Sequence, residues 1–449
     1  EAISYSNYGT MLAGYIVQHL SGVPYEQYVQ EKILEPLGMR HSTMVQPPEQ
    51  ALSMQAVHMA QAYSYTDGKY RREPFEYING APAGALTASC PDMLRFYRAY
   101  LNEGSNENGT VLQPATVREM RNTSFRFDPR ANGMAHGFME MGTQNTPVLG
   151  HGGDTIYFHS ISGYLPTEEW AYFISTNSAS GSSLIYALHQ EMLNEFLPMP
   201  DGKVLSAEAE ADPNLQEYAV TFTMDRRSES DPTQIMGLMA RLKPVVSDDG
   251  RGLFIKSILD PQGSVYVPVA EDIFQQENGR MRVIFMRDKR GRVSSVYANE
   301  APVFLFTRPP WIEGLYLNLT VLGVGLLMLL SALIAPPAGV LTLIPKLRPD
   351  STGRALTVFR TSVWSYVGLI VLQIGIVMSL GNLIFIPIGP RHALPLYAAT
   401  FSLLVTATAL VQMWRKKILK PAGRIYTTLF VVAQALLIGC FAYWGFFFV

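Results

Sequence analysis

The sequence predicts an α+β domain, in which helices flank an antiparallel sheet, followed by a small all-β domain and a bundle of transmembrane helices. Three composition blocks along the 449 residues predict this order. Residues 1–200 alternate helical and strand patterns, residues 201–310 are polar and rich in short β-branched runs, and residues 311–449 hold long apolar stretches. We take these blocks as three domains.

The first block opens with a predicted amphipathic helix. Its apolar residues between Tyr8 and Leu20 recur at i, i+3, i+4 and i+7, which places them on one helix face. Ser6 or Asn7 can cap the start of this helix, and Gly22 ends it. We therefore expect helical structure directly after the first few residues.

Three further helices are expected in the same block. The second begins after Pro24 and ends before Pro36, because proline fits the first turn of a helix but disfavours helix in the residue before it. Ser89 and Asp92 have the spacing of a capping box and predict the third helix. The last covers residues 183–196, whose apolar residues share one face.

Residues 147–180 predict the strands of this block. The pattern is strand, turn, strand, turn, strand, and we expect the first turn to be a tight one formed by Gly152 and Gly153. The last predicted helix can then lie across the resulting sheet.

The second block alternates short β-branched or aromatic runs with turn dipeptides. The runs are residues 253–258, 265–269, 281–286 and 293–297, and the turns are Asp249-Gly250, Asn278-Gly279 and Arg290-Gly291. This pattern predicts an antiparallel meander or a small barrel. The residues indicate no particular chemistry, so a packing or spacer role is expected.

Four stretches in the third block are long and apolar enough to cross a bilayer. They are residues 315–334, 363–388, 394–414 and 425–449, and none contains Asp, Glu, Lys, Arg or His. Several Lys and Arg lie in the loops 335–362 and 415–424, which the positive-inside rule places in the cytoplasm. We expect a multi-pass plasma membrane protein with residues 1–310 outside the cytoplasm; one run could instead be re-entrant or buried.

Composition excludes several classes of partner. A formal net charge of −2, without a basic stripe, gives no reason to expect nucleic acid. The eight histidines and two cysteines show no metal-ligand spacing, so neither a metal nor another cofactor is expected. A hydrophobic content of 48% with only 16% charged residues instead indicates a lipid bilayer as partner.

Two short motifs carry candidate chemistry. Tyr5-Ser6-Asn7 stands directly before the first helix, and His151-Gly152-Gly153 ends a predicted strand before Asp154. Other nucleophile motifs, such as Gly-x-Ser-x-Gly and Ser-x-x-Lys, are absent from the 449 residues. Taken singly, the motifs could be a packed aromatic beside an ordinary helix cap, and a histidine in a turn.

These motifs and their surroundings resemble the serine β-lactamase-related hydrolases, including class C β-lactamases and penicillin-binding-protein-like esterases and peptidases. The resemblance lies in residues 5–39, 82–104 and 149–178, and it implies a β-lactamase/DD-peptidase-like sheet. Residues 216–308 are similar to a small β domain appended to some of these hydrolases, and terminal membrane helices occur in relatives that act outside the cytoplasmic membrane.

The family brings three motifs together in one cleft: Ser-x-x-Lys, Tyr-x-Asn, and Lys-Thr-Gly or His-x-Gly. Tyr5 and Asn7 match the second motif, and His151 with Gly153 matches the third. The first motif precedes Tyr-x-Asn in the family, so we expect this chain to be N-terminally incomplete and inactive by itself.

The resemblance implies acyl transfer, and each matched residue suits a role in it. Tyr5 can act as general base in acylation and as general acid toward the leaving group. Asn7 can hold a lysine or the acyl amide of the substrate, because an amide both donates and accepts hydrogen bonds. His151 stands where many relatives have Lys, and a mostly neutral imidazole pairs less well with a substrate carboxylate.

Three residues after or within the third motif complete the predicted site. Gly152 and Gly153 allow a substrate to approach the strand backbone closely. The amide N–H of Asp154 can form an oxyanion hole together with that of the family's serine.

We therefore expect a membrane-anchored serine hydrolase that acts outside the cytoplasmic membrane. Its substrate is a small ester, an amide or a peptide, processed through an acyl-enzyme. One alternative is a non-catalytic binding or sensor protein for peptidoglycan or peptide ligands. A transporter is a weaker alternative, because the four apolar stretches carry no ionisable residue.

Overall fold

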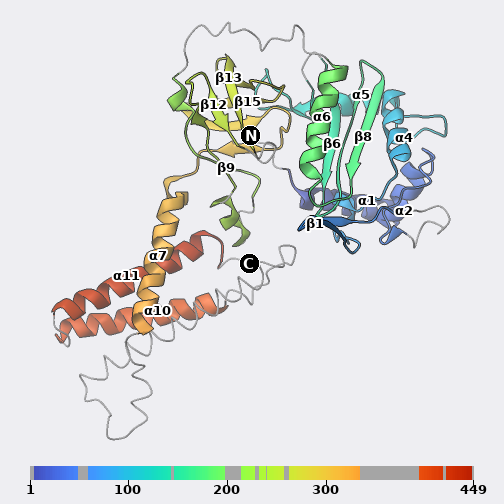
Figure 1. The fold of residues 1–449 in the computed structure, drawn as a ribbon. Helices are drawn as coiled ribbons and strands as arrows, with labels where there is room; N and C mark the ends of the chain where they lie inside the picture. The colour runs from blue at the N-terminus through green and yellow to red at the C-terminus, as the bar shows by residue number, and fades with distance from the viewer. Residues whose placement is uncertain are drawn as a thin grey trace. The chain divides into compact units, whose positions relative to one another are not determined.

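The computed structural model describes most of the chain. The described residues are 5–48, 59–142, 146–197, 214–227, 232–238, 240–256, 262–333, 394–417 and 421–446. They belong to two compact units, residues 1–226 with 242–308, and residues 227–241 with 309–449 (Figure 1). We call residues 5–197 the N-terminal domain, and residues 214–226 with 242–308 the small β domain.

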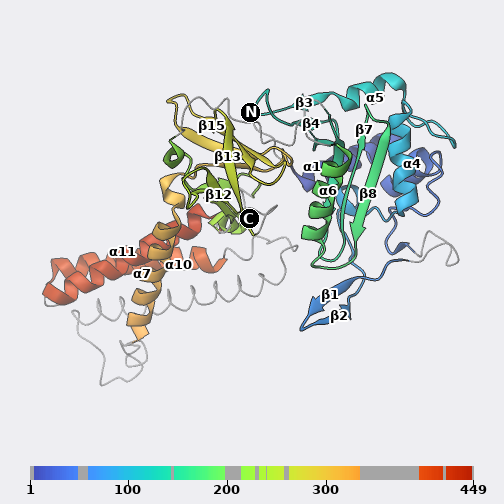
Figure 2. The same cartoon turned by 45° about the horizontal axis from the view of Figure 1, so that its top comes forward.

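The N-terminal domain is built on a six-stranded antiparallel sheet in the order β3-β4-β5-β6-β7-β8. Its strands are β3 (Thr123–Phe125), β4 (Met134–Ala135), β5 (Met139–Glu140), β6 (Leu149–Asp154), β7 (His159–Leu165) and β8 (Trp170–Thr176). This sheet confirms the predicted fold class. A separate hairpin of β1 (Tyr63–Thr66) and β2 (Lys69–Arg72) projects from the domain (Figure 2).

The four predicted helices are present, as α1 (Asn7–Ser21), α2 (Tyr25–Val29) continued by the π-helix η1 (Gln30–Leu34), α4 (Cys90–Leu101) and α6 (Ser182–Phe196). Two short helices, α3 (Ala81–Gly84) and α5 (Pro114–Arg121), were not predicted. The Ser6 hydroxyl accepts a hydrogen bond from the Gly9 amide at 3.2 Å, and Gly22 ends α1 with a φ of 74°. The Ser89 hydroxyl caps α4 in the same way.

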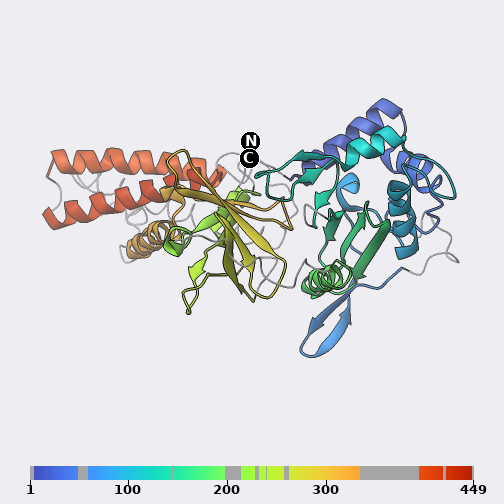
Figure 3. The ribbon, with the colours of Figure 1, turned by 90° about the horizontal axis from the view of Figure 1, so that it is seen from above.

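Side chains alternate between the two faces of the six-stranded sheet, so each face carries its own core. On one face Ile161 and Leu165 pack with Ile185 and Leu193 of α6. On the other, Leu149 and Tyr164 pack with residues of α4 and α5. The helices α6 and α4 accordingly lie on opposite sides of the strands (Figure 3).

The expectation of a glycine turn after the first strand was wrong. Gly152 and Gly153 lie within β6 and pair with residues of β7. The turn is formed by residues 155–158, where the Glu76 carboxylate accepts hydrogen bonds from the Thr155 hydroxyl at 2.6 Å and from the Ile156 amide at 2.8 Å. Because the Glu76 carboxylate accepts the hydrogen bonds of the turn residues, no glycine is needed there and β6 continues to Asp154.

The small β domain is the predicted antiparallel meander. Its sheet has the order β10-β9-β17-β16-β15-β14-β13-β12-β11. The strands are β9 (Phe222–Met224), β10 (Arg241–Leu242), β11 (Val245–Val246), β12 (Leu253–Ile255), β13 (Ser264–Ala270), β14 (Ile273–Gln276), β15 (Arg282–Arg287), β16 (Val293–Ala298) and β17 (Leu305–Thr307). The strand patterns did not predict β9, β10, β11, β14 or β17, which are only two to four residues long.

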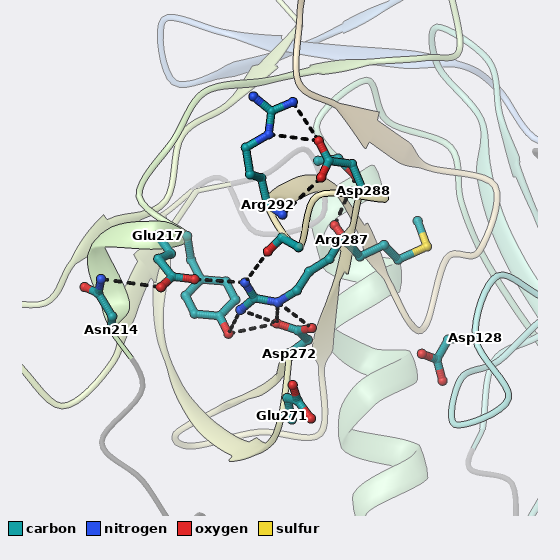
Figure 4. Close-up of polar contacts among 12 residues, drawn as sticks. Asp128, Asn214, Glu217, Glu271, Asp272, Arg287, Asp288 and Arg292 are labelled. Carbon is teal, nitrogen blue, oxygen red and sulfur yellow. Dashed lines mark hydrogen bonds and ion pairs between the residues drawn. The ribbon is translucent and has the colours of Figure 1, made fainter.

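A charged network fastens the first turn of this domain to its sheet. The Arg287 guanidinium donates to the Asp272 carboxylate at 3.1 Å, to the Glu217 carboxylate at 2.9 Å and to the Tyr218 hydroxyl at 3.0 Å (Figure 4). The short 3-10 helix η3 (Leu215–Glu217) is thereby held against β14 and β15.

The two domains of the first unit share a small core. The loop between β3 and β4 places Phe127 and Ala131 among apolar residues of the small β domain, including Ile284 and Tyr297. Next to this core, the backbone N–H of the buried Asn132 donates to the Asn299 side-chain oxygen at 2.8 Å. The shared core and this hydrogen bond fix one domain against the other.

The second unit contains the apolar helices α7 (Leu315–Leu333), α10 (Leu394–Arg415) and α11 (Pro421–Tyr443). By length and composition, α10 and residues 424–443 of α11 could cross a membrane. The stretch predicted at residues 363–388 lies outside the described residues. Just before α7, Glu313 accepts two hydrogen bonds from Arg227, at 2.7 and 2.9 Å.

The first prediction concerns the tight packing of β6. A Cβ atom at Gly150 would collide with the Ser162 carbonyl oxygen and with the Met141 methyl group. We expect Gly150→Ala to lower the free energy of unfolding of this domain by about 1–3 kcal/mol, because an extra methyl group must displace packed atoms. Urea denaturation followed by tryptophan fluorescence, to which Trp170 in β8 contributes, measures this change.

Gly9→Ala is the matched control, since it makes the same substitution in the same domain. Its Cβ would lie 3.6 Å from the Ser6 Cβ, an ordinary contact, and α1 would lose a flexible residue. We expect unchanged or slightly higher stability. Equal effects of the two substitutions would contradict the packing argument.

Candidate active site

The two motifs meet although they are far apart in the sequence. Ser6, the residue before α1, has extended backbone angles, so Tyr5 leaves the helix axis and turns toward the sheet. Its hydroxyl lies 3.3 Å from the His151 Nε2 atom, and the two ring centroids are 5.7 Å apart. Tyr5 and His151 can therefore form a direct hydrogen bond.

The contacts of His151 define which nitrogen carries the proton. The Nδ1 atom faces the Gly152 carbonyl oxygen, which can only accept, so Nδ1 donates. The Nε2 atom is then the acceptor for the Tyr5 hydroxyl. Burial lowers the pKa of His151, and the positive charge of Arg226 lowers it further. The structure thus favours a neutral imidazole.

The other predicted residues line the same cleft. Its volume is about 620 Å³, and Tyr5, Asn7 and His151 contribute to its wall. Asn7 is the first residue of α1 and is exposed, and its amide makes no hydrogen bond within the described part of the chain. Its side chain is accordingly available to a ligand.

The edge of β6 is open along this cleft. Strand β5 pairs only with Leu149 and Gly150, so residues 151–154 have no strand partner on that edge among the described residues. A Cβ at Gly152 would stand 3.0 Å from the Tyr186 hydroxyl, and one at Gly153 would stand 3.0 Å from the Ser160 hydroxyl. Because glycine has no side chain, both positions leave room for an extended ligand to lie beside the strand.

The backbone N–H of Asp154 is the predicted oxyanion donor, and its carboxylate has a separate structural role. Strand alternation turns its carboxylate to the α6 face, away from His151. There it accepts hydrogen bonds from His159 Nδ1 at 2.6 Å, from the Ser182 hydroxyl at 3.1 Å and from the Tyr186 hydroxyl at 3.2 Å. The carboxylate joins the end of β6 to α6 and holds the edge in place.

Arg226 is a site residue that the sequence did not reveal. Its guanidinium carbon lies 4.5 Å from the centroid of the Tyr5 ring and 5.9 Å from that of Phe304, distances typical of cation–π contacts. It also lines the cleft. No motif surrounds Arg226, and only the fold brings it to Tyr5.

Comparison with known proteins identifies the first part of the chain. Residues 1–192 match the Beta-lactamase family model. This part of the chain is a Beta-lactamase family domain. It contains both motifs and the whole six-stranded sheet.

Individual relatives of the Beta-lactamase domain are distant. Penicillin-binding protein 4 of Amycolatopsis lactamdurans is 26% identical over 223 residues, which are 47% of this chain and 56% of the relative. Beta-lactamase-like protein 2 of Dictyostelium discoideum is 30% identical over 120 residues, 26% of this chain and 20% of the relative. A crystal structure of SurE has a TM-score of 0.43 and 20% identity over 69% of both chains. The chain thus spans about half the length, or less, of the two curated relatives.

The second prediction is that His151 in the Beta-lactamase domain titrates below the usual value. Its buried neutral ring favours deprotonation, so its pKa lies lower in the folded than in the unfolded chain. We expect an NMR titration midpoint below about 6.5, the value of an unperturbed histidine. Comparison with a His151→Gln variant identifies the signal.

The urea-unfolded chain is the control and should return the ordinary midpoint. Because protonation opposes folding here, the contribution of His151 to stability is lost as the pH falls below the unfolded value and through the folded one. A folded midpoint at or above the unfolded one would contradict the neutral acceptor role of Nε2.

Proposed function

We propose that the protein carrying this chain is a serine hydrolase that acts on an ester, an amide or a peptide through an acyl-enzyme. The hydrogen-bonded pair of Tyr5 and His151, beside Asn7 in the cleft of a Beta-lactamase family domain, is the observation that carries the proposal. Both motifs of the resemblance lie in one cleft, as acyl transfer requires.

The proposed proton path uses the tautomer of His151. As a serine oxygen attacks the acyl carbon, its proton passes to the Tyr5 oxygen while the Tyr5 proton moves to His151 Nε2. The reverse movement delivers a proton to the leaving group when the bond to the acyl carbon breaks. The backbone N–H of Asp154 together with that of the serine would hold the oxyanion.

In this proposal the serine and its lysine come from a Ser-x-x-Lys segment outside the 449 residues, which contain no such motif. The surface of α1 supports a further packing segment. Its apolar residues are exposed, Tyr8 at 71% and Leu20 at 80%. Three others on the helix are exposed as well: Leu12, Tyr15 and Ile16. A surface of this kind normally packs against another part of a protein.

A non-catalytic binding protein is the second candidate. The absence of Ser-x-x-Lys from these residues favours it, because the cleft could then bind a peptide or peptidoglycan fragment without cleaving it. The two candidates share the cleft and differ in the nucleophile.

We further propose that the protein is a multi-pass plasma membrane protein with residues 1–310 outside the cytoplasm. The length and apolar composition of α10 and α11 support the membrane location. The basic residues of the loops 335–362 and 415–424 support the orientation.

The third prediction tests Tyr5 in the full gene product. Tyr5→Phe removes only the phenol oxygen, so acylation by a fluorophosphonate probe should slow by about 10²–10⁴-fold, the usual contribution of general acid–base catalysis. Tyr8→Phe is the matched control, because it also removes only a phenol oxygen and Tyr8 does not line the cleft of the described residues. Unchanged labelling of Tyr5→Phe would refute its role, and a gene without Ser-x-x-Lys would refute the hydrolase.

The fourth prediction uses a natural cysteine as a topology reporter. Cys90 is exposed at the start of α4. A charged maleimide does not cross a bilayer, so it should label Cys90 in intact cells if residues 1–310 are outside. Cys90→Ser should abolish labelling, whereas Cys440→Ser should leave it unchanged. Labelling that appears only after permeabilisation would contradict the orientation.

A further inference from the structure

The small β domain supplies part of the cleft wall. Residues of the turn between β14 and β15 and of the segment between β16 and β17 line the same space as Tyr5 and His151. Among them are Arg280, Glu300 and Phe304, and Arg226, which follows β9, lines the cleft as well. A domain without recognisable chemistry of its own thus contributes charged groups to the candidate active site.

Arg226 is a cation that lies beside the Tyr5–His151 pair. Its position is fixed by Asp225, whose amide donates to the Leu305 carbonyl oxygen at 2.9 Å and whose carboxylate accepts from the Thr307 hydroxyl. The guanidinium stacks on Tyr5 and forms no ion pair within the described residues. Its hydrogen-bond donors are therefore available to a ligand.

Arg280 adds a second cation to the same cleft. Its Nε atom is buried and has no hydrogen-bond partner in the described part of the structure. An unmatched buried donor costs free energy, and a ligand oxygen would satisfy it. Glu300 acts on Arg280 only in its ionised form, and it forms no ion pair with Arg280 among the described groups.

The acidic residues of the cleft do not cancel these cations near the reacting groups. The Asp154 carboxylate is already hydrogen-bonded on the α6 face. Burial raises the pKa of Glu300 to about 7, so much of it is uncharged near neutral pH. Glu191 is exposed on α6. Arg226, in contrast, lies beside the pair, and its positive charge adds to the effect of burial in lowering the pKa of His151.

We propose that Arg226, assisted by Arg280, forms an anion-binding subsite that selects substrates carrying a carboxylate. A guanidinium matches a carboxylate with two parallel hydrogen bonds, which a neutral imidazole cannot form. The subsite supplies the positive charge that His151 does not provide. This inference rests on the proposed function for the ligand being a substrate, whereas the anion preference itself is a binding property.

Two ligands that differ only in charge test the subsite. N-benzoylglycine carries a carboxylate, and N-benzoylglycinamide carries an amide in its place. Isothermal titration of the full chain at low salt should show about tenfold or more tighter binding of the carboxylate, the size expected of one charge-assisted hydrogen bond. Arg226→Gln should bring the two affinities close to each other, Arg280→Gln should narrow the difference, and Arg226→Lys should retain part of it.

Arg292→Gln is the matched control. Arg292 pairs with Asp288 in the turn between β15 and β16 and does not line the cleft, so the preference should be unchanged. Equal binding of the two ligands, binding of neither, or a preference that survives both glutamine variants would overturn the subsite.

Fluorophosphonate labelling of the full gene product distinguishes this inference from the proposed function. An enzyme that is labelled but binds both ligands equally would be a hydrolase without the anion subsite. A protein that prefers the carboxylate through Arg226 but is not labelled would keep the subsite and lose the hydrolase function.

Discussion

The close contact of β6 with its neighbours at Gly150 is the constraint on which the site depends. There the strand is paired on both sides, with β5 and with β7, and no side chain fits. One residue later the pairing with β5 stops, and His151 faces Tyr5 at the start of α1. The packing at Gly150 fixes the position of His151. The edge of residues 151–154, which β5 does not pair with, is open to a ligand. Asp154 and Glu76 then hold the far end of the strand and its turn.

The small β domain is held against the N-terminal domain, so the part of the cleft wall that it forms is also fixed. The core around Ala131 and Tyr297 and the hydrogen bond between Asn132 and Asn299 are buried, so the cleft wall contributed by residues 276–304 has a defined position. A domain that served only as a spacer would not need a buried core and a buried hydrogen bond shared with the N-terminal domain. The cation–π contact of Arg226 with Tyr5 depends on them, because the two residues belong to different domains.

Local sequence patterns predicted what is local in this structure. The caps at Ser6, Gly22 and Ser89 are decided by residues within a few positions. The longer strands were predicted from β-branched and aromatic runs between turn residues. The glycine turn was misplaced because Glu76, far away in sequence, replaces the turn chemistry that glycine would supply. Arg226 was missed for the same reason: its role comes from a contact across the fold. Pairing of Tyr5 with His151 was expected only through a family resemblance, since no local rule relates them.

In the proposed mechanism His151 cannot both accept from Tyr5 and bind a carboxylate, because the first needs a neutral ring and the second a positive one. A histidine that accepts the Tyr5 proton must be neutral, whereas a residue that binds a carboxylate must be positive. If His151 were protonated to bind an anion, Nε2 would become a donor and could no longer accept from the Tyr5 hydroxyl. Burial and the nearby guanidinium keep the imidazole neutral, and the same guanidinium provides the positive charge. In this proposal Arg226 keeps the resting His151 ring neutral, so that Nε2 can accept from the Tyr5 hydroxyl, and its guanidinium provides the positive charge for a carboxylate.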